Sequence, residues 1–265
     1  MQPLANITPL KPAGAIEVRN VGQIFKTTTQ DVVALEDVSL DVKPGRFVVL
    51  VGPSGCGKST LLMMMAGLRQ QTAGTILIND APILQPDPNR VGVVFQEASL
   101  FPWLTAEENV EFPLALRRVP KNERRAKAQD ALTLVGLDGF GTRHPHELSG
   151  GMKQRVSIAR GLVQDPPVLL MDEPFAALDE QTRMTMGDEL LRIWAATGKT
   201  VVFVTHSLTE AVYLADEVVV MSARPGRIVD HLQVSLPRPR TYDMLSGDTF
   251  GTLRERIWRH IRKSA

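Results

Sequence analysis

The segment from Gly52 to Thr60 constrains this chain most, because it carries the spacing Gly-x-x-x-x-Gly-Lys-Ser at Gly52, Gly57, Lys58 and Ser59. A loop that wraps a polyphosphate needs backbone N–H groups pointing inward, and glycines permit that close approach. In such a loop the lysine reaches the β- and γ-phosphates, and the serine hydroxyl ligates Mg²⁺. The segment therefore predicts a nucleotide-binding phosphate loop.

The flanking residues support this interpretation. Residues 46–51, one arginine followed by five apolar residues, are typical of a buried strand, and residues 59–66 predict a helix that ends at Gly67. A loop between a strand and a helix N-terminus favours anions through the helix dipole and its free N–H groups. We expect the rest of the loop to contact the phosphates as well: Pro53, Ser54, Gly55, Cys56 and Thr60. A bulky thiol reagent on Cys56 should then clash with the ligand.

A second helix N-terminus with small residues, after that of the phosphate loop, is predicted at Leu148-Ser149-Gly150-Gly151-Met152. Apolar residues recur with helical spacing from Lys153 to Gln164, Ser149 stands at the N-cap position, and two glycines leave the helix N-terminus bare. This pattern fits a second anion-binding helix start. An ordinary capped helix is the alternative for this motif taken alone.

Two further strands end in side chains suited to phosphate chemistry. Residues 168–171 predict a strand buried on both faces, followed by Asp172 and Glu173. At that edge of a sheet, Asp172 suits a contact to Mg²⁺ through water, and Glu173 suits the base or water-orienting role at the γ-phosphate. A strand ending in solvated acids is the alternative.

The other strand covers residues 200–205 and ends at His206, for which we expect a γ-phosphate contact. Residues 207–210, Ser-Leu-Thr-Glu, predict a capping box that opens the next helix.

Together these residues resemble the ATPase subunit of an ATP-binding cassette (ABC) transporter, over roughly Ile16 to Arg240. The resemblance implies an α/β fold: a P-loop NTPase (RecA-like) core with an antiparallel β subdomain and an inserted α-helical subdomain near residues 97–163. The cofactors it implies are ATP and Mg²⁺. Residues 1–15 predict a flexible tail, residues 16–240 the ATPase domain, and residues 241–265 a basic amphipathic C-terminal helix.

The resemblance also assigns roles to single residues. Gln96 matches the glutamine loop, a metal contact beside Ser59 and Asp172, and His206 matches the switch histidine. Phe25 stands where the family places an aromatic that stacks on adenine. Ala177-Leu178-Asp179 matches the aspartate loop.

Leu148–Met152 matches the family signature, and in the family the helix at this motif, the signature helix, closes over the nucleotide of a second subunit. No internal repeat appears, so two chains would pair head to tail, as a homodimer with two composite sites. The neighbour's ATP would be contacted by Ser149, Gly150, Gly151 and Asp179. The chain's own ATP would be contacted by Lys58, Ser59, Gln96, Asp172, Glu173 and His206.

The segments LFPWLTAEENV, HPHELSGGMKQR and MDEPFAALDEQTR look like an importer of the nitrate, sulfonate, taurine and bicarbonate type. The family grips a helix of its permease just after the glutamine loop, so Leu100, Phe101 and Trp103 would form an apolar groove for it. Packing of these residues inside the α-helical subdomain is the alternative. The implied partners are permease subunits and, indirectly, a solute-binding protein, which places the subunit at the cytoplasmic face of the inner membrane.

Other function classes fit less well. A soluble ABC ATPase not coupled to transport, or an importer of this type for an unrelated solute, stays open. A small-molecule kinase would need neither Leu148–Met152 nor His206. The net charge of +1 predicts no strong attraction to nucleic acid, and no apolar stretch reaches the length of a membrane span.

The C-terminal segment leaves two alternatives. Phe250, Leu253, Ile257 and Ile261 fall on one helical face, and the rest of the helix is basic. The helix could lie on a membrane surface or dock against the ATPase domain.

Overall fold

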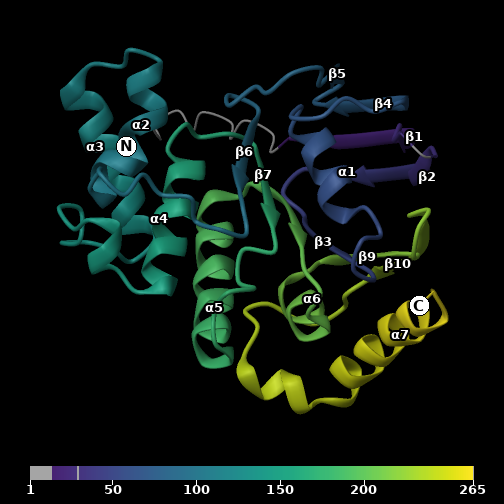
Figure 1. The fold of residues 1–265 in the computed structure, drawn as a ribbon. Coiled ribbons are helices and arrows are strands. Elements are labelled where there is room, and N and C mark those ends of the chain that lie inside the picture. The colour runs from purple at the N-terminus through teal and green to yellow at the C-terminus, as the bar shows by residue number, and fades with distance from the viewer. Residues whose placement is uncertain (1–13, 29, 265) are drawn as a thin grey trace, which may run out of the picture.

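The structure, a computed structural model, describes residues 14–28 and 30–264. The described residues form two β-sheets and a lobe of helices, with the lobe at the left and the smaller sheet at the upper right of Figure 1. Residues 1–13 of the predicted N-terminal tail lie outside the described residues.

The central element is a six-stranded sheet with the strand order β10-β9-β3-β8-β7-β6. The pairs β9-β3, β3-β8, β8-β7 and β7-β6 are parallel, and β10 is antiparallel to β9. The strands are β3 (Phe47–Val51), β6 (Val91–Val94), β7 (Val168–Asp172), β8 (Thr200–Val204), β9 (Glu217–Met221) and β10 (Ile228–Gln233). The four central strands are buried almost throughout, which explains their continuous apolar runs.

The two faces of this sheet belong to separate hydrophobic cores. Phe47, Val49 and Val51 point to one core, whereas Val48 and Leu50 point to the other, as the period of two in a strand requires. The first core lies under α4 (Gly150–Leu162), α5 (Glu180–Thr197), α6 (Leu208–Leu214) and the C-terminal helix. The second lies under α1 (Lys58–Met65) and the smaller sheet.

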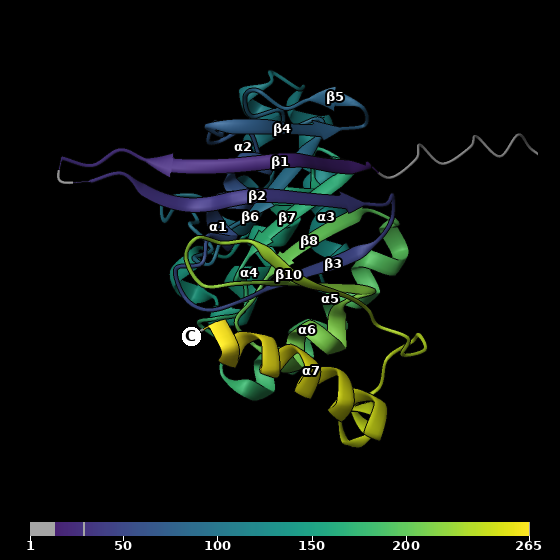
Figure 2. The ribbon, with the colours of Figure 1, turned by 90° about the vertical axis from the view of Figure 1, so that its right-hand side faces the viewer.

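The smaller sheet is antiparallel, with the strand order β2-β1-β4-β5. Its strands are β1 (Ile16–Phe25), β2 (Val32–Val42), β4 (Ala73–Ile78) and β5 (Ala81–Pro82). It lies beside α1 in Figures 1 and 2 and shares the second core with that helix. The α/β architecture with an antiparallel β subdomain is thereby confirmed.

The helical lobe consists of α2 (Ala106–Leu116) and α3 (Lys121–Leu134), which contact α4. The predicted capping box at Thr105 is present: Glu108 N donates to Thr105 Oγ1 (3.2 Å) and Thr105 N donates to Glu108 Oε2 (2.8 Å). Asn109 is fully buried, and its side chain bonds both the N–H and the carbonyl of Phe101. The loop before α2 is therefore fixed to that helix. A short turn, η1 (Pro145–Glu147), leads to α4.

The C-terminal segment forms η2 (Tyr242–Ser246) and α7 (Asp248–Ser264). Helix α7 contacts α6, β9 and β10, and it runs along the lower edge of the molecule in Figure 2. Phe250 and Ile257 are 1% exposed in this contact. Of the two alternatives for this helix, the structure has its apolar face docked on the ATPase domain. Among the described residues, no helix is long and apolar enough to cross a membrane.

Candidate nucleotide-binding site

The phosphate loop joins the end of β3 to the N-terminus of α1, as predicted. Gly57 is the N-cap residue of α1 and has a φ of 100°, in the left-handed region that favours glycine. A Cβ at this position would lie 2.5 Å from Leu35 Cδ2, so a larger residue would displace the loop from β2. The loop therefore keeps the bare backbone that an anion site needs.

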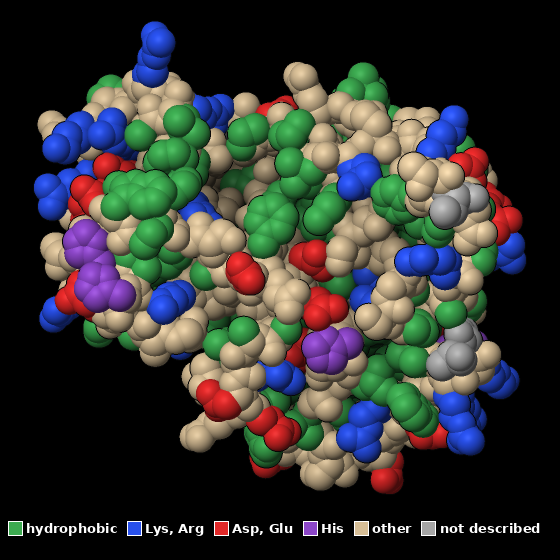
Figure 3. Space-filling model, in the orientation of Figure 1, with side chains coloured by type: hydrophobic (Ala, Val, Ile, Leu, Met, Phe, Trp, Pro, Cys, Tyr) green, Lys and Arg blue, Asp and Glu red, His purple; other side chains and the backbone are tan. Residues whose placement is uncertain are grey.

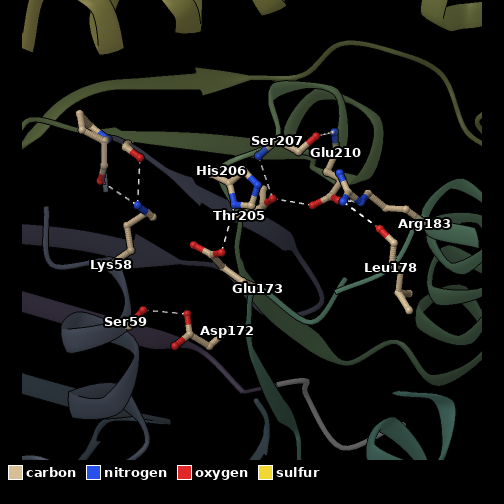
Figure 4. Close-up of polar contacts among 12 residues, drawn as sticks. Lys58, Ser59, Asp172, Glu173, Leu178, Arg183, Thr205, His206, Ser207 and Glu210 are labelled. Carbon is tan, nitrogen blue, oxygen red and sulfur yellow. Dashed lines mark hydrogen bonds and ion pairs between the residues drawn. The ribbon is translucent and has the colours of Figure 1, made fainter. Parts of the chain in front are cut away.

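Lys58 lies under this loop, 6% exposed. Its Nζ donates to the carbonyls of Gly52 (2.9 Å) and Pro53 (3.0 Å), which holds the ammonium inside the curve of the loop (Figure 4). The side chain thus supplies a buried positive charge beside the free N–H groups of α1.

A pocket of about 350 Å³ opens over the loop. The phosphate loop lines it with Ser54, Gly55, Gly57, Lys58, Ser59 and Thr60. Five residues from other elements complete the lining: Phe25, Ala34, Glu173, His206 and Arg224. Three separately predicted motifs, which contain Lys58, Glu173 and His206, therefore meet at one pocket. Figure 3 shows acidic and histidine side chains near the middle of this face of the molecule.

Ser59 and Asp172 meet at the edge of this pocket. Ser59 Oγ donates to Asp172 Oδ1 at 2.9 Å (Figure 4). Burial raises the pKa of the Asp172 carboxyl, and the hydrogen bond from Ser59 only partly opposes this rise. A nearby cation would favour the charged form of this carboxylate.

Glu173 directly follows Asp172 and contacts the histidine at the end of β8. Its Oε2 lies 3.0 Å from His206 Nδ1. The φ of Glu173 is +45°, an unusual value for a residue with a side chain, and its N–H donates to Val204 O at 2.9 Å. The backbone of Glu173 is thus hydrogen-bonded to β8 in a strained conformation. Strained residues of this kind are often found at functional sites.

A second polar group lies behind His206. Thr205 donates its hydroxyl hydrogen to Glu210 Oε2 (2.5 Å), and Arg183 Nε lies 3.4 Å from Glu210 Oε1. Arg183 also donates to Leu178 O (3.0 Å) in the aspartate loop (Figure 4). Burial raises the pKa of the Glu210 carboxyl, and Thr205 and Arg183 oppose this effect. One carboxylate therefore links the histidine segment to the aspartate loop.

The predicted capping box at residues 207–210 is half wrong for the same reason. Ser207 Oγ accepts from Glu210 N (3.3 Å), so the serine is an N-cap. The Glu210 carboxylate, however, turns to Thr205 and Arg183, and Ser207 N donates to Thr205 Oγ1 (2.9 Å) instead. The half-buried guanidinium of Arg183 attracts this carboxylate more strongly than a backbone N–H does.

Several predicted site residues lie elsewhere in this chain. Gln96 is exposed just after β6 and does not line the pocket. Ser149 and Gly151 line a different pocket, of about 310 Å³, between α4 and α5. Asp179 is exposed and accepts from Thr182 N (2.9 Å) as the N-cap of α5.

The signature helix differs slightly from its predicted bounds. It begins at Gly150, three residues before the predicted start, and Ser149 caps it by accepting from Met152 N (3.3 Å). Both glycines are therefore part of the first turn, with their N–H groups at its free end.

Cys56 and Phe25 have opposite surroundings. Cys56 is fully buried in the second core and does not line the pocket, and its sulfur lies 3.7 Å from Lys58 Nζ, so the structure lends no support to the expected clash of a thiol adduct with phosphates. Phe25 does line the pocket, and the Arg69 guanidinium lies 5.0 Å from its ring centroid. This cation–π contact supports the ring at the pocket edge.

Sequence reasoning missed Arg224 as a lining residue. It lies in the loop after β9, and β9 pairs in parallel with β3, the strand that leads into the phosphate loop. Parallel neighbours place their carboxyl ends at the same edge of a sheet, so the strand order was the missing signal.

Comparison with known proteins agrees with this site. The ABC transporter family model matches residues 35–176. An uncharacterized ABC transporter ATP-binding protein of Methanocaldococcus jannaschii is 50% identical over 225 residues, which cover 85% of this chain and 84% of the relative. The aliphatic sulfonates import ATP-binding protein SsuB of Bacillus cereus is 41% identical over 248 residues, 94% of this chain and 96% of the relative.

Solved structures show the same fold. A dimeric ATP-binding cassette in a post-hydrolysis state, bound to ADP and Pi, is 34% identical and covers 84% of this chain and 100% of its own, with a TM-score of 0.74. A component of the cbiONQ ABC transporter complex of Clostridium perfringens is 28% identical, covers 83% of this chain and 88% of its own, and has a TM-score of 0.74. With its phosphate loop, signature helix and glutamate–histidine pair in one such cassette, the chain belongs to the ABC transporter family, as an ATP-binding subunit that hydrolyses ATP.

Proposed function

We propose that this ATPase powers the uptake of a small anion through a membrane permease. An organic sulfonate is the first candidate for this anion. The similarity to a sulfonate import protein over nearly the whole chain carries this proposal. At the cytoplasmic face of the membrane, it would bind integral-membrane permease subunits, and these would receive the solute from a solute-binding protein on the other side. An importer of the same type for nitrate or for an unrelated small solute is the second candidate.

The helical lobe offers a surface for the permease. Trp103 is 70% exposed, and its ring lies 5.4 Å from the ring of Phe101, which in turn lies 4.6 Å from Phe112. Figure 3 shows apolar side chains gathered over this lobe. Leu100, by contrast, packs on the first core. The exposed Trp103 and the partly buried Phe101 therefore support the expected contact with a permease helix, whereas Leu100 follows the alternative of packing inside the chain.

Two chains are proposed to share each catalytic site. Lys58 and Glu173 line one pocket, whereas Ser149 and Gly151 lie outside it, at the free N-terminus of α4. A head-to-tail pair would bring each signature helix over the partner's nucleotide and add a second helix dipole to the phosphates. A solved relative is a dimer, which supports this arrangement.

Within each site, the residues have separate tasks. Lys58 and the N–H groups of α1 would neutralise the phosphate charge, and Glu173 would orient the attacking water. His206, 3.0 Å from Glu173, would hold that carboxylate and contact the γ-phosphate.

The residues present also fit a magnesium ion. Ser59 Oγ and Asp172 Oδ1 lie 2.9 Å apart beside the phosphate loop, and hard cations prefer such oxygen ligands. These two side chains would hold the ion, with Gln96 as a third ligand after closure. When bound, Mg²⁺ supplies positive charge at the phosphoryl oxygens.

Reconstitution tests the proposal. The subunit is assembled with its permease in proteoliposomes, and ATP-driven uptake of a labelled alkanesulfonate is measured with the solute-binding protein present. Glu173→Gln serves as the control, because it leaves the assembly intact and removes hydrolysis. Sulfonate uptake that depends on ATP and on Glu173 supports the proposal. Stable assembly with uptake of nitrate alone would favour the second candidate, and failure to bind any permease would favour an ATPase outside transport.

A further inference from the structure

The loop after β9 brings a second cation to the phosphate loop. Arg224 and Lys58 are the two cationic side chains among the residues that line the nucleotide pocket. The position that a Cβ on Gly55 would occupy lies 3.8 Å from Arg224 Nη2, so the guanidinium stands over the phosphate loop itself. Gly55 has a φ of +74° and no side chain between this guanidinium and the pocket.

The backbone around Arg224 is held against the phosphate loop. Gly226 N donates to Ala34 O (2.9 Å), and Glu36 N donates to Gly226 O (3.1 Å). A Cβ on Gly226 would lie 2.0 Å from Cys56 O, so this loop touches the backbone of the phosphate loop directly. Ser222 N donates to Arg227 O (2.9 Å), and Ser222 Oγ accepts from Arg227 N (3.0 Å), which closes the turn. The turn therefore cannot drift away from the phosphate loop without loss of these contacts.

The two arginines of this turn have different surroundings. Arg227 forms an ion pair with Glu36 at 2.7 Å. Arg224, in the part of the chain that the structure describes, makes no hydrogen bond or ion pair with another residue, although a rigid turn positions it. This exposed guanidinium is fixed at a pocket for a polyphosphate, and no carboxylate neutralises it. It is therefore suited to donate a hydrogen bond to a phosphate oxygen.

We propose that Arg224 is a nucleotide-binding residue that donates to a phosphate oxygen of bound ATP. It acts from the β9 side of the phosphate loop, whereas Lys58 acts from beneath the loop. This inference rests on the ATPase activity alone and holds whatever solute the subunit helps to import.

Binding of MgATP to the purified chain tests the inference by titration calorimetry. Arg224→Ala should weaken binding about tenfold, the usual cost of a lost charged hydrogen bond. Arg224→Lys should restore part of this loss, and Arg224→Gln should not, because the charge is the cause. Arg227→Ala is the matched control on the same turn and should bind MgATP within about twofold of the unchanged chain.

Salt dependence separates a phosphate contact from a structural role. Between low and moderate ionic strength, the KM for ATP should rise less in Arg224→Ala than in the unchanged chain, because one screened charge is missing. The melting temperature should stay the same, since the side chain is exposed. Equal affinity for MgATP in both chains, or equal losses in Arg224→Ala and Arg227→Ala, would overturn the inference. Loss of uptake in proteoliposomes with an unchanged affinity for ATP would concern the import proposal instead.

Discussion

The side chain of Lys58 lies enclosed by the phosphate loop. It is 6% exposed and donates to two loop carbonyls. Lys58→Ala should weaken MgATP binding more than tenfold, because the variant loses a charged donor at the phosphates and leaves two carbonyls without a partner. Titration calorimetry measures the affinity, and circular dichroism checks the fold. Unchanged affinity in a folded variant would contradict the phosphate-loop assignment.

Cys56 shows what a motif does not reveal about a side chain. The motif places it in the loop, but the thiol is fully buried against the second core. Maleimide should therefore react with native protein at least tenfold more slowly than with protein in denaturant, whether or not MgATP is present. Mass spectrometry of timed samples measures the rates. Fast native labelling that MgATP blocks would show that the thiol faces the ligand after all.

At the scale of elements, Glu210 joins α6 to the end of β8 and to α5. Burial raises the pKa of this carboxyl, so the native state holds its proton to a higher pH than the unfolded chain does. The free energy of unfolding should then fall as the pH rises from the ordinary pKa of a glutamate through the raised value.

Glu210→Gln removes this dependence and serves as the comparison. Urea unfolding from pH 4 to pH 7 should show the unchanged chain losing stability relative to the variant as the pH rises. A relative gain over that range would mean that the ion pair with Arg183 outweighs the cost of burial.

The helical lobe carries a prediction about assembly. Trp103 is 70% exposed, so Trp103→Ala should change the melting temperature and the basal ATPase rate little. An aromatic at the centre of an interface contributes about 2 kcal/mol or more, so permease binding should weaken roughly thirtyfold. Trp258→Ala, at a tryptophan that is 49% exposed on α7, is the control. Copurification with the permease measures both, and equal recovery would show that Trp103 lies outside the interface.

The elements that were predictable from sequence are those with strong local patterns. The buried strands β3, β7 and β8 stand out as apolar runs, and Thr105 and Glu108 mark the start of α2. The start of α4 was predicted three residues late, because glycine is a poor helix former and Ser149 caps it from outside.

The other features of the site depend on contacts between residues that lie far apart in the sequence. The contact of Arg224 with the pocket depends on β9 lying beside β3, and the direction of Glu210 depends on Arg183 from another helix. The burial of Cys56 depends on the packing of α1 against the smaller sheet. No local sequence pattern encodes these neighbours, whereas the phosphate loop, the acidic pair and the histidine each follow a strand and were found from it.

For the whole molecule, the central claim is that each catalytic site takes its phosphate loop from one chain and its signature helix from another. The separation of Lys58 and Glu173 from Ser149 and Gly151 in one chain is the structural basis of this claim. Glu173→Gln should bind ATP without hydrolysing it, so the closed dimer should accumulate.

Light scattering of Glu173→Gln with MgATP, alone and combined with Ser149→Arg, tests this claim most directly. The mass of Glu173→Gln should double from 29.2 kDa when MgATP is added. The added Ser149→Arg should keep the chain monomeric while MgATP affinity stays within about twofold, because Ser149 would meet only the partner's nucleotide. A Glu173→Gln chain that stays monomeric with saturating MgATP, or a Ser149→Arg chain that no longer binds ATP as a monomer, would contradict the account.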